Sequence, residues 1–122
     1  MITNFYALCA ADETLTQLLD SSDGLKIYLI GDVATDVSAP YVTYQTISGY
    51  SYNALSDRSS ADNITLQIDV WSPDYRLGHQ IANRVRYAVE LVADVSRISI
   101  DEKDKESNLY RISFDVEFIV YR

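Results

Sequence analysis

Apolar side chains recur at helical spacing near the start of the chain. Phe5, Leu8, Ala11, Leu15 and Leu18 follow one another at intervals of three and four, with Leu19 beside the last. This spacing places them on one face of an amphipathic helix over residues 3–20. The turn residues 21–24, which end in a glycine, are expected to stop that helix.

A second helix is predicted from Ser72 to about Ala93. Ser72 is a candidate N-cap, Pro73 suits the first helical position, and Asp74 places an acidic residue in the first turn. An apolar stripe then follows, formed by Leu77, Ile81, Val85, Ala88 and Val92 and widened by Ala82 and Val89. One face of this helix should therefore pack on a sheet.

Strict alternation of apolar and polar residues predicts two long strands, at 63–71 and 110–121. In the second, Ile119 falls on the otherwise polar side with Arg111, Ser113, Asp115 and Glu117. Shorter β-rich runs at 25–30, 41–48 and 95–100 predict three more strands. Residues 31–39 fit either a hairpin or a wide loop, and the charged run 101–108 is expected to be a hairpin loop.

The predicted order is α-β-β-β-α-β-β in a single domain of residues 1–122. Strands with one apolar face favour a two-layer α+β fold, in which two helices pack on one face of a mostly antiparallel or mixed sheet.

Residues 49–62 form the longest stretch without predicted structure. Tyr50, Tyr52 and Leu55 give this stretch apolar anchors, and Arg58 adds a cation. Loops of this length in compact domains are commonly functional or become ordered on binding. The stretch is interpreted as a candidate interface; the alternative is a mobile hairpin tip without a role.

Composition narrows the functional classes. The formal net charge of −8 leaves little positive potential for binding phosphates, which argues against tight nucleic-acid binding. No apolar run reaches the ~20 residues that span a bilayer, so no membrane association is expected and a cytoplasmic protein is predicted. The single cysteine, Cys9, is expected to be a buried helix residue without a disulfide.

Catalytic motifs are not apparent. His79 is the only histidine and has no nucleophile motif beside it. The carboxylates of residues 101–106 alternate with lysines, as in a solvated loop, and Asp69 and Asp115 fit the outward face of a sheet. The four glycines make no phosphate-binding loop. We therefore expect no enzyme activity, no cofactor and no metal site.

Three motifs carry a resemblance to a known family. They are a Pro-Tyr-Val-x-Tyr-Gln-x-Ile-Ser-Gly segment at residues 40–49, a Gln-Ile-Asp-Val-Trp strand end at 67–71, and Leu-Tyr-Arg at 109–111. In this order, after an N-terminal helix and with a Val85-Arg86 pair in the second helix, the chain resembles the tail completion proteins of siphophages and gene transfer agents. These are similar in fold to the lambda-type tail terminators. The segment from Tyr75 to His79 departs from the small, alanine-rich helix surface of that family.

The resemblance implies a structural virion protein that caps the tail tube as a hexameric ring, stops tail growth and joins the tail to the head. Implied partners are further copies of the chain, the major tail tube protein and a head completion or connector protein. DNA would pass the pore without specific binding, and the protein would assemble in the host cytoplasm into the virion tail. A ring needs two different complementary patches on each subunit.

Candidate patches are the 49–62 stretch and the polar face of the second helix with Arg76, Arg84 and Arg86. The arginines fit an ordinary solvated helix face equally well. The acidic charge suits a pore for DNA, although acidity also serves solubility alone. The main alternative function is a small non-phage interaction module that oligomerises through an edge strand. A hydrolase that uses acidic residues is a further alternative.

Overall fold

A five-stranded mixed sheet forms the centre of the protein, whose structure is a computed structural model that describes residues 2–52 and 58–122. The strands lie in the order β3 (Ile27–Leu29), β4 (Tyr41–Ser51), β5 (Ala61–Ser72), β7 (Leu109–Tyr121) and β6 (Ala93–Asp104). β3 runs parallel to β4, and every other pair in this sheet is antiparallel. The 31–39 connection is thus a wide loop that returns the chain parallel to β3, not a hairpin.

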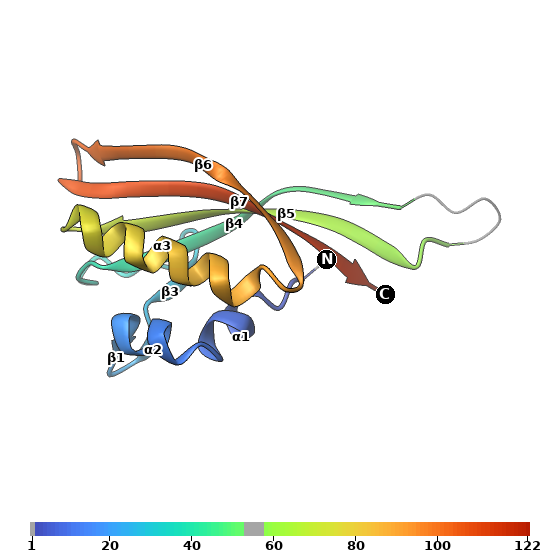
Figure 1. The fold of residues 1–122 in the computed structure, drawn as a ribbon, viewed down its shortest axis with the longest axis horizontal. Coiled ribbons are helices and arrows are strands. Elements are labelled where there is room, and N and C mark those ends of the chain that lie inside the picture. Colours follow the sequence, from blue (N-terminus) through green and yellow to red (C-terminus); the bar gives the residue numbers. More distant parts are fainter. Residues whose placement is uncertain (1, 53–57) are drawn as a thin grey trace.

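Three helices cover one face of this sheet (Figure 1): α1 (Phe5–Ala10), α2 (Glu13–Leu19) and α3 (Tyr75–Val89). A small ribbon of β1 (Asp20–Ser21) and β2 (Gly24–Leu25) links α2 to the sheet. The predicted α+β class and the mixed sheet are confirmed, as is the order of the five main strands around the long helix.

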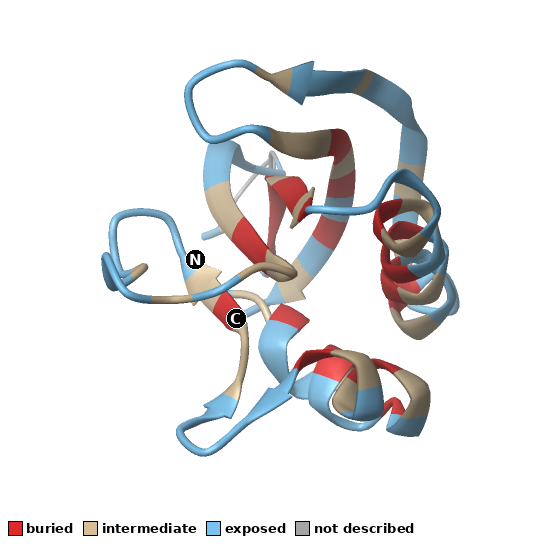
Figure 2. Cartoon of the chain, turned by 90° about the vertical axis from the view of Figure 1, so that its left-hand side faces the viewer, coloured by how far each residue is buried: buried red, intermediate tan, exposed pale blue. Residues whose placement is uncertain are grey.

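The core lies between these helices and the sheet (Figure 2). It is built from the apolar positions that the sequence pattern indicated, among them Phe5, Leu15, Leu19, Ile64, Ile68, Val70, Ile81, Val85, Ile112 and Val116, all fully buried. Cys9 is also buried, as predicted, and its burial raises the pKa of its thiol to about 12.

The helix predicted over residues 3–20 is in fact two helices. The chain turns at Ala11 and Asp12, and the Asp12 carboxylate accepts a hydrogen bond of 3.0 Å from the Leu15 amide, which makes Asp12 the N-cap of α2. The apolar spacing persists across the break, because both short helices face the same core. For this reason periodicity alone did not reveal the break.

Two details of the long helix also differ from expectation. Its N-cap is Asp74, whose side chain accepts from the Arg76 amide at 3.1 Å, and not Ser72. The Ser72 hydroxyl instead bonds the backbone of Asp74. The helix ends at Val89, so Val92 leaves the apolar stripe and is 58% exposed.

Four of the five strands are longer than the sequence pattern indicated, whereas β3, at Ile27–Leu29, is shorter than the predicted run 25–30. β4 continues to Ser51 and β5 begins at Ala61, so much of the stretch predicted as a loop over 49–62 is paired strand. β6 continues to Asp104, and the predicted 101–108 loop shrinks to a turn in which Asn108 has a φ of 60°. These strand ends were not predicted because they lie outside the helix-covered core. Their residues are therefore largely polar and show no clear alternation of apolar and polar positions.

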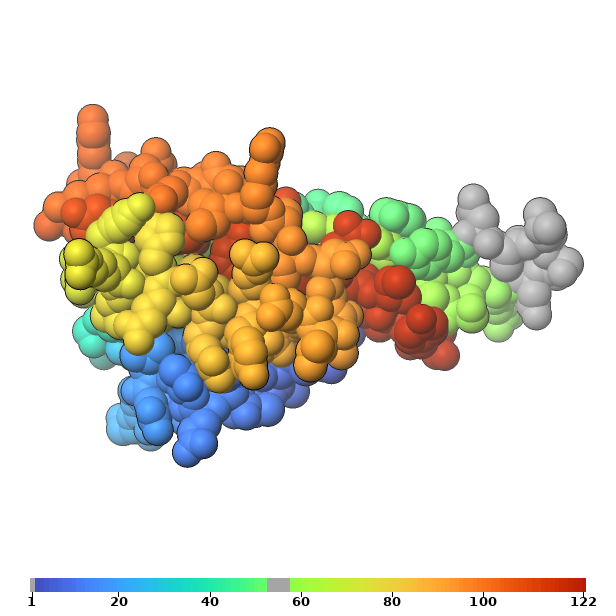
Figure 3. All heavy atoms as spheres, viewed as in Figure 1, coloured from blue at the N-terminus to red at the C-terminus, as the bar shows by residue number. Residues whose placement is uncertain are grey.

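This extension creates a projecting β arm, defined here as residues 48–51 of β4, 61–63 of β5 and 119–121 of β7. The three strands run past the helices and leave the body at one end (Figure 1). The space-filling view shows the same projection (Figure 3). A bulge between Thr46 and Ser48 marks the place where the β4 register changes at the base of the arm.

Gly78 offers a test of how tightly α3 packs on the sheet. A Cβ at this position would lie 2.9 Å from Cδ1 of buried Ile112 and 3.2 Å from Cβ of Ser72. Overpacking of about 1–3 kcal/mol should exceed the gain in helix propensity, about 1 kcal/mol. We expect Gly78→Ala to lower the free energy of unfolding by about 1 kcal/mol in a denaturant titration. Gln80→Ala, at an exposed site on the same helix, should change it by less than about 0.5 kcal/mol; a stabilised Gly78→Ala would contradict the packing argument.

Candidate assembly surfaces

The three motifs that carried the family resemblance meet at the end of the sheet opposite the arm. Tyr41, Trp71 and Arg111 lie directly beside one another on β4, β5 and β7. The Arg111 Nε donates to the buried Asp69 carboxylate at 2.8 Å, and its guanidinium lies 5.3 Å from the centre of the Trp71 ring. These motif residues therefore fix three strands together on the face of the sheet that carries no helix.

The predicted tyrosines lie on the arm and on the segment that follows it. Tyr50 is 52% exposed and packs edge to face against Tyr52, with ring centres 5.9 Å apart. The Asn63 amide donates to the Tyr52 hydroxyl at 3.2 Å and to the Glu117 carboxylate at 2.5 Å. Leu55 lies outside the described residues, and Arg58 is exposed just before β5.

Arg122, which directly follows β7, contacts both other strands of the arm through an ion pair to β5 and a hydrogen bond to β4. The Arg122 guanidinium donates to the Asp62 carboxylate at 2.8 Å and to the Ser51 hydroxyl at 2.7 Å. The hydrogen bond from Arg122 holds the pKa of Asp62 below its ordinary value. Three strands without helical cover are thereby held together by their own side chains.

Arg84, one of the three predicted helix arginines, has a clear role within the subunit. Its Nε donates to the Asp12 carboxylate at 2.9 Å, and its guanidinium lies 4.0 Å from the centre of the Tyr87 ring. Asp12 is buried and caps α2. Arg84 therefore fastens α3 to the first two helices, a role that the sequence did not indicate.

The other two arginines remain exposed on α3. Arg86 makes a loose pair with Glu90, at 3.8 Å, and Arg76 lies in the first turn of the helix. The first turn of α3 is at the end of the body opposite the arm (Figure 1). The structure thus does not join the predicted arginines and tyrosines into one patch, and their contribution to an interface stays a prediction.

His79 belongs to a small surface cluster. Its ring stacks on Tyr75 with centres 4.6 Å apart, and its Nε2 lies 3.1 Å from the Asp101 carboxylate. The Tyr75 hydroxyl donates to the same oxygen at 3.0 Å, which raises the pKa of Tyr75. These contacts join the start of α3 to β6.

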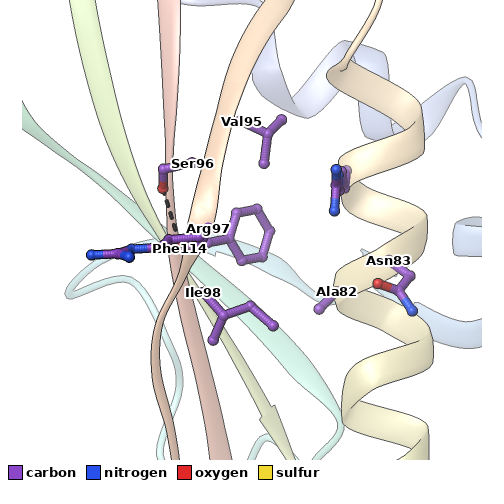
Figure 4. Close-up of a pocket in the computed structure, with 8 residues that line it drawn as sticks. Ala82, Asn83, Val95, Ser96, Arg97, Ile98 and Phe114 are labelled. Atoms are coloured by element: carbon purple, nitrogen blue, oxygen red, sulfur yellow. Dashed lines mark hydrogen bonds between the residues drawn. The ribbon is translucent and has the colours of Figure 1, made fainter.

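A small hollow between α3 and β6 is too small for a substrate. Val95, Ile98 and Phe114 point from the sheet towards Ala82 and Asn83 of α3, whereas Arg97 points away (Figure 4). The volume of this hollow, about 50 Å³, is far below the few hundred Å³ of ordinary ligand sites. Within residues 2–52 and 58–122, no three His, Cys, Asp or Glu side chains gather as metal ligands. In the same residues, no helix has the length and apolar character needed to cross a membrane.

Sequence reasoning missed an exposed apolar region at the base of the arm. Leu91 is 93% exposed in the turn after α3, beside Val92 and near Ile119 of β7, which is 51% exposed. Tyr121, at the end of the arm, is 76% exposed. The signal available in the sequence was the position of Ile119 among polar residues of an alternating strand.

Exposed strand ends and exposed apolar side chains lie together at one end of the body, as is typical of a subunit that assembles with other chains. A profile of the tail completion protein gp17 family matches residues 3–121. The chain therefore belongs to the tail completion protein gp17 family and is a non-enzymatic structural component of a phage-type virion tail. The family predicted from the sequence is confirmed.

Two solved structures share the fold. A chain in the virion of a native gene transfer agent particle superposes with a TM-score of 0.68 at 17% sequence identity, covering 97% of this chain and 92% of that one. The gp17 protein of bacteriophage SPP1 gives a TM-score of 0.56 at 14% identity, covering 97% of this chain and 86% of that one. A sequence comparison with curated proteins gave no significant match.

The Asp12 and Arg84 pair predicts a pH-dependent part of the stability. Burial alone would raise the pKa of Asp12, but hydrogen bonds from Arg84 and the Leu15 amide outweigh it and hold the pKa below 3.8. A carboxyl with a lowered pKa stabilises the fold above its unfolded pKa, and this stabilisation is lost as the pH falls through the folded value. Asp12→Asn should therefore cost about 1 kcal/mol at pH 7.

The difference between the parent protein and Asp12→Asn should shrink as denaturant titrations are repeated from pH 7 down to pH values below about 3.8. Glu13→Gln, at the exposed neighbouring residue, is the control and should show no comparable loss. A constant difference at all pH values would show that the Asp12 ion pair does not contribute.

Proposed function

We propose that the protein forms a hexameric ring on the finished tail tube, stops its growth and presents the surface to which the head is joined. The observation that carries this proposal is the β arm, which projects from the body with exposed Tyr50 and Tyr121 and without a helix to cover it. A subunit in a ring needs a surface that reaches its neighbour and a different surface that receives it. In this proposal the arm is the surface that contacts the neighbouring subunit. Membership of the tail completion family supports a position on the tail.

The partners in this proposal are further copies of the chain, the major tail tube protein on one side of the ring and a head completion or connector protein on the other. The elongated shape supports two separate contact regions, because the arm and the Tyr41, Trp71 and Arg111 cluster lie at opposite ends of the sheet. Exposed tyrosine and arginine side chains are favoured in such contacts.

The charge of the chain supports passage of DNA through the ring without binding. The chain has eighteen acidic residues and only ten lysines and arginines. Several of those cations are paired with carboxylates, including Arg84, Arg111 and Arg122. A surface poor in unpaired cations releases few counterions from DNA and binds it weakly. The non-phage interaction module considered from the sequence is set aside, since the chain belongs to a tail protein family.

The proposal is tested by deleting the gene from its phage or prophage and examining the particles by negative-stain microscopy. We expect tails of abnormal length, or tails separate from full heads, and rescue when the protein is supplied in trans. Normal infectious particles without the protein would refute the proposal.

A matched pair of variants locates the function on the arm. Tyr50→Ala should lower the yield of finished particles by about tenfold or more, because loss of a tyrosine hot spot costs about 2 kcal/mol and about 1.4 kcal/mol already corresponds to tenfold in affinity. Tyr6→Ala, at a comparably exposed tyrosine on α1, should rescue as the parent does. Equal rescue by both variants would move the interface away from the arm.

A further inference from the structure

The sheet has unpaired edges of two different kinds. The outer edge of β6 is irregular, because its register with β7 shifts between Val95 and Ile98 and again between Ile98 and Ile100. The hydroxyl of Ser96 accepts a hydrogen bond from the Asp115 amide at 2.9 Å, in place of a regular strand contact. Charged residues follow along Asp101 to Asp104. Bulges and charges of this kind are features that prevent an edge from pairing with another chain.

The edge of β4 lacks such protection along the arm. β3 pairs with β4 only as far as Tyr44, so within residues 2–52 and 58–122 no strand lies on that side of β4 over residues 48–51. The Tyr52 amide donates to the Ala61 carbonyl on β5, which directs the backbone groups of Tyr52 inwards. By alternation, the N–H and C=O groups of Gly49 and Ser51 point outwards.

The edge of β7 is bare in the same region. β6 begins at Ala93, opposite Phe118, so among the residues that the structure describes, β7 has a strand beside residues 119–121 only on the β5 side. The Arg122 amide donates to the Ser60 carbonyl and so faces inwards. By the same alternation, the backbone groups of Ile119 and Tyr121 point outwards, and both side chains are more than half exposed.

We propose that the bare β7 edge of one copy pairs with the bare β4 edge of the next copy, so that the arms join edge to edge into one continuous sheet. This proposal rests on the proposed ring and names the surface that builds it. The two edges are different and lie on opposite sides of the same arm, which is the arrangement that head-to-tail association requires. Each copy has one edge of each kind. A row of paired copies can therefore close into a ring in which every arm edge is paired.

Charge favours a second copy of the arm as the occupant of each edge. The whole chain carries a net charge of −8, so that two bodies repel each other. By sequence, the arm and its flanking residues, 48–64 and 117–122, hold only a small share of this charge: Arg58 and Arg122 against Asp57, Asp62 and Glu117. Copies therefore meet with the least repulsion at their arms.

Disulfide trapping in assembled particles tests the pairing. One cysteine replaces Ile119 or Tyr121 on β7, and a second replaces Ser48, Tyr50 or Tyr52 at the β4 edge, which gives six double variants that scan the unknown register. All these side chains lie on the helix-free face of the sheet. Within one subunit β5 separates the two positions by about 9–10 Å, too far for a disulfide. Cys9 is buried with a pKa of about 12 and stays unreactive.

We expect at least one double variant to give a ladder of covalent multimers when particles are oxidised and run without reductant. Variants with only one of the two cysteines should give none, and a pair that uses Glu102 on the protected β6 edge in place of the β7 position should also give none. A dimer from a single-cysteine variant would mean that like edges pair, and would overturn the proposal.

The absence of a ladder from all six variants, in particles with normal tails that contain the protein, would overturn edge pairing and leave the ring function standing. Normal tails in particles that lack the protein would instead refute the ring function. The two failures are thus distinguished by the same preparation.

Proline variants test the backbone contribution independently. Ser51→Pro and Ser51→Ala both lose the hydroxyl that contacts Asp62 and Arg122, but only proline also removes the outward N–H. Tyr121→Pro and Tyr121→Ala form the same kind of matched pair on β7. Each proline variant should give fewer finished particles than its alanine partner, with unchanged far-ultraviolet circular dichroism, because only the proline variant also loses the backbone hydrogen bond. Equal rescue by folded proline and alanine variants would overturn the pairing.

Discussion

The mismatch in length between α3 and the strands it covers determines the shape of the molecule. α3 has 15 residues and β5 has 12, which correspond to about 22 Å of helix and about 40 Å of strand. A helix that packs along the sheet therefore leaves nearly half of the strand length without cover. Because β4, β5 and β7 all continue together, the excess becomes an arm and not a frayed end.

An uncovered three-stranded arm cannot rely on a hydrophobic layer, and polar side chains replace that layer. Asp62 is almost fully buried although the arm has no helix above it, because Arg122 and Ser51 surround its carboxylate. Asn63 is equally buried on the other face between Tyr52 and Glu117. Buried polar groups are stable only when their hydrogen bonds are satisfied, so this design fixes the geometry of the arm.

The sequence predicted those parts of the fold in which one face is buried against a helix. Alternation in β5 and β7 and the stripe from Leu77 to Val89 are direct consequences of that burial. The sequence pattern failed where hydrogen bonds of polar side chains decide the structure, as at Asp12, which breaks the first helix, and at Ser48 to Ser51, where a strand continues. Neither position carries a hydrophobic signal, and the partners of both are distant in the chain, at Arg84 and Arg122.

The same reasoning explains why the assembly surface was only half visible in the sequence. Tyr50 and Tyr52 stand out by residue type, and Ile119 stands out as an apolar residue in a polar register. The unpaired backbone edges beside these residues could not be predicted from residue types, because a bare edge is defined by where the neighbouring strands end. That point is set by Tyr44 on one side of the sheet and by Ala93 on the other. A bare edge that persists beyond both limits is a surface that a solitary protein avoids, and the proposed closed assembly accounts for it.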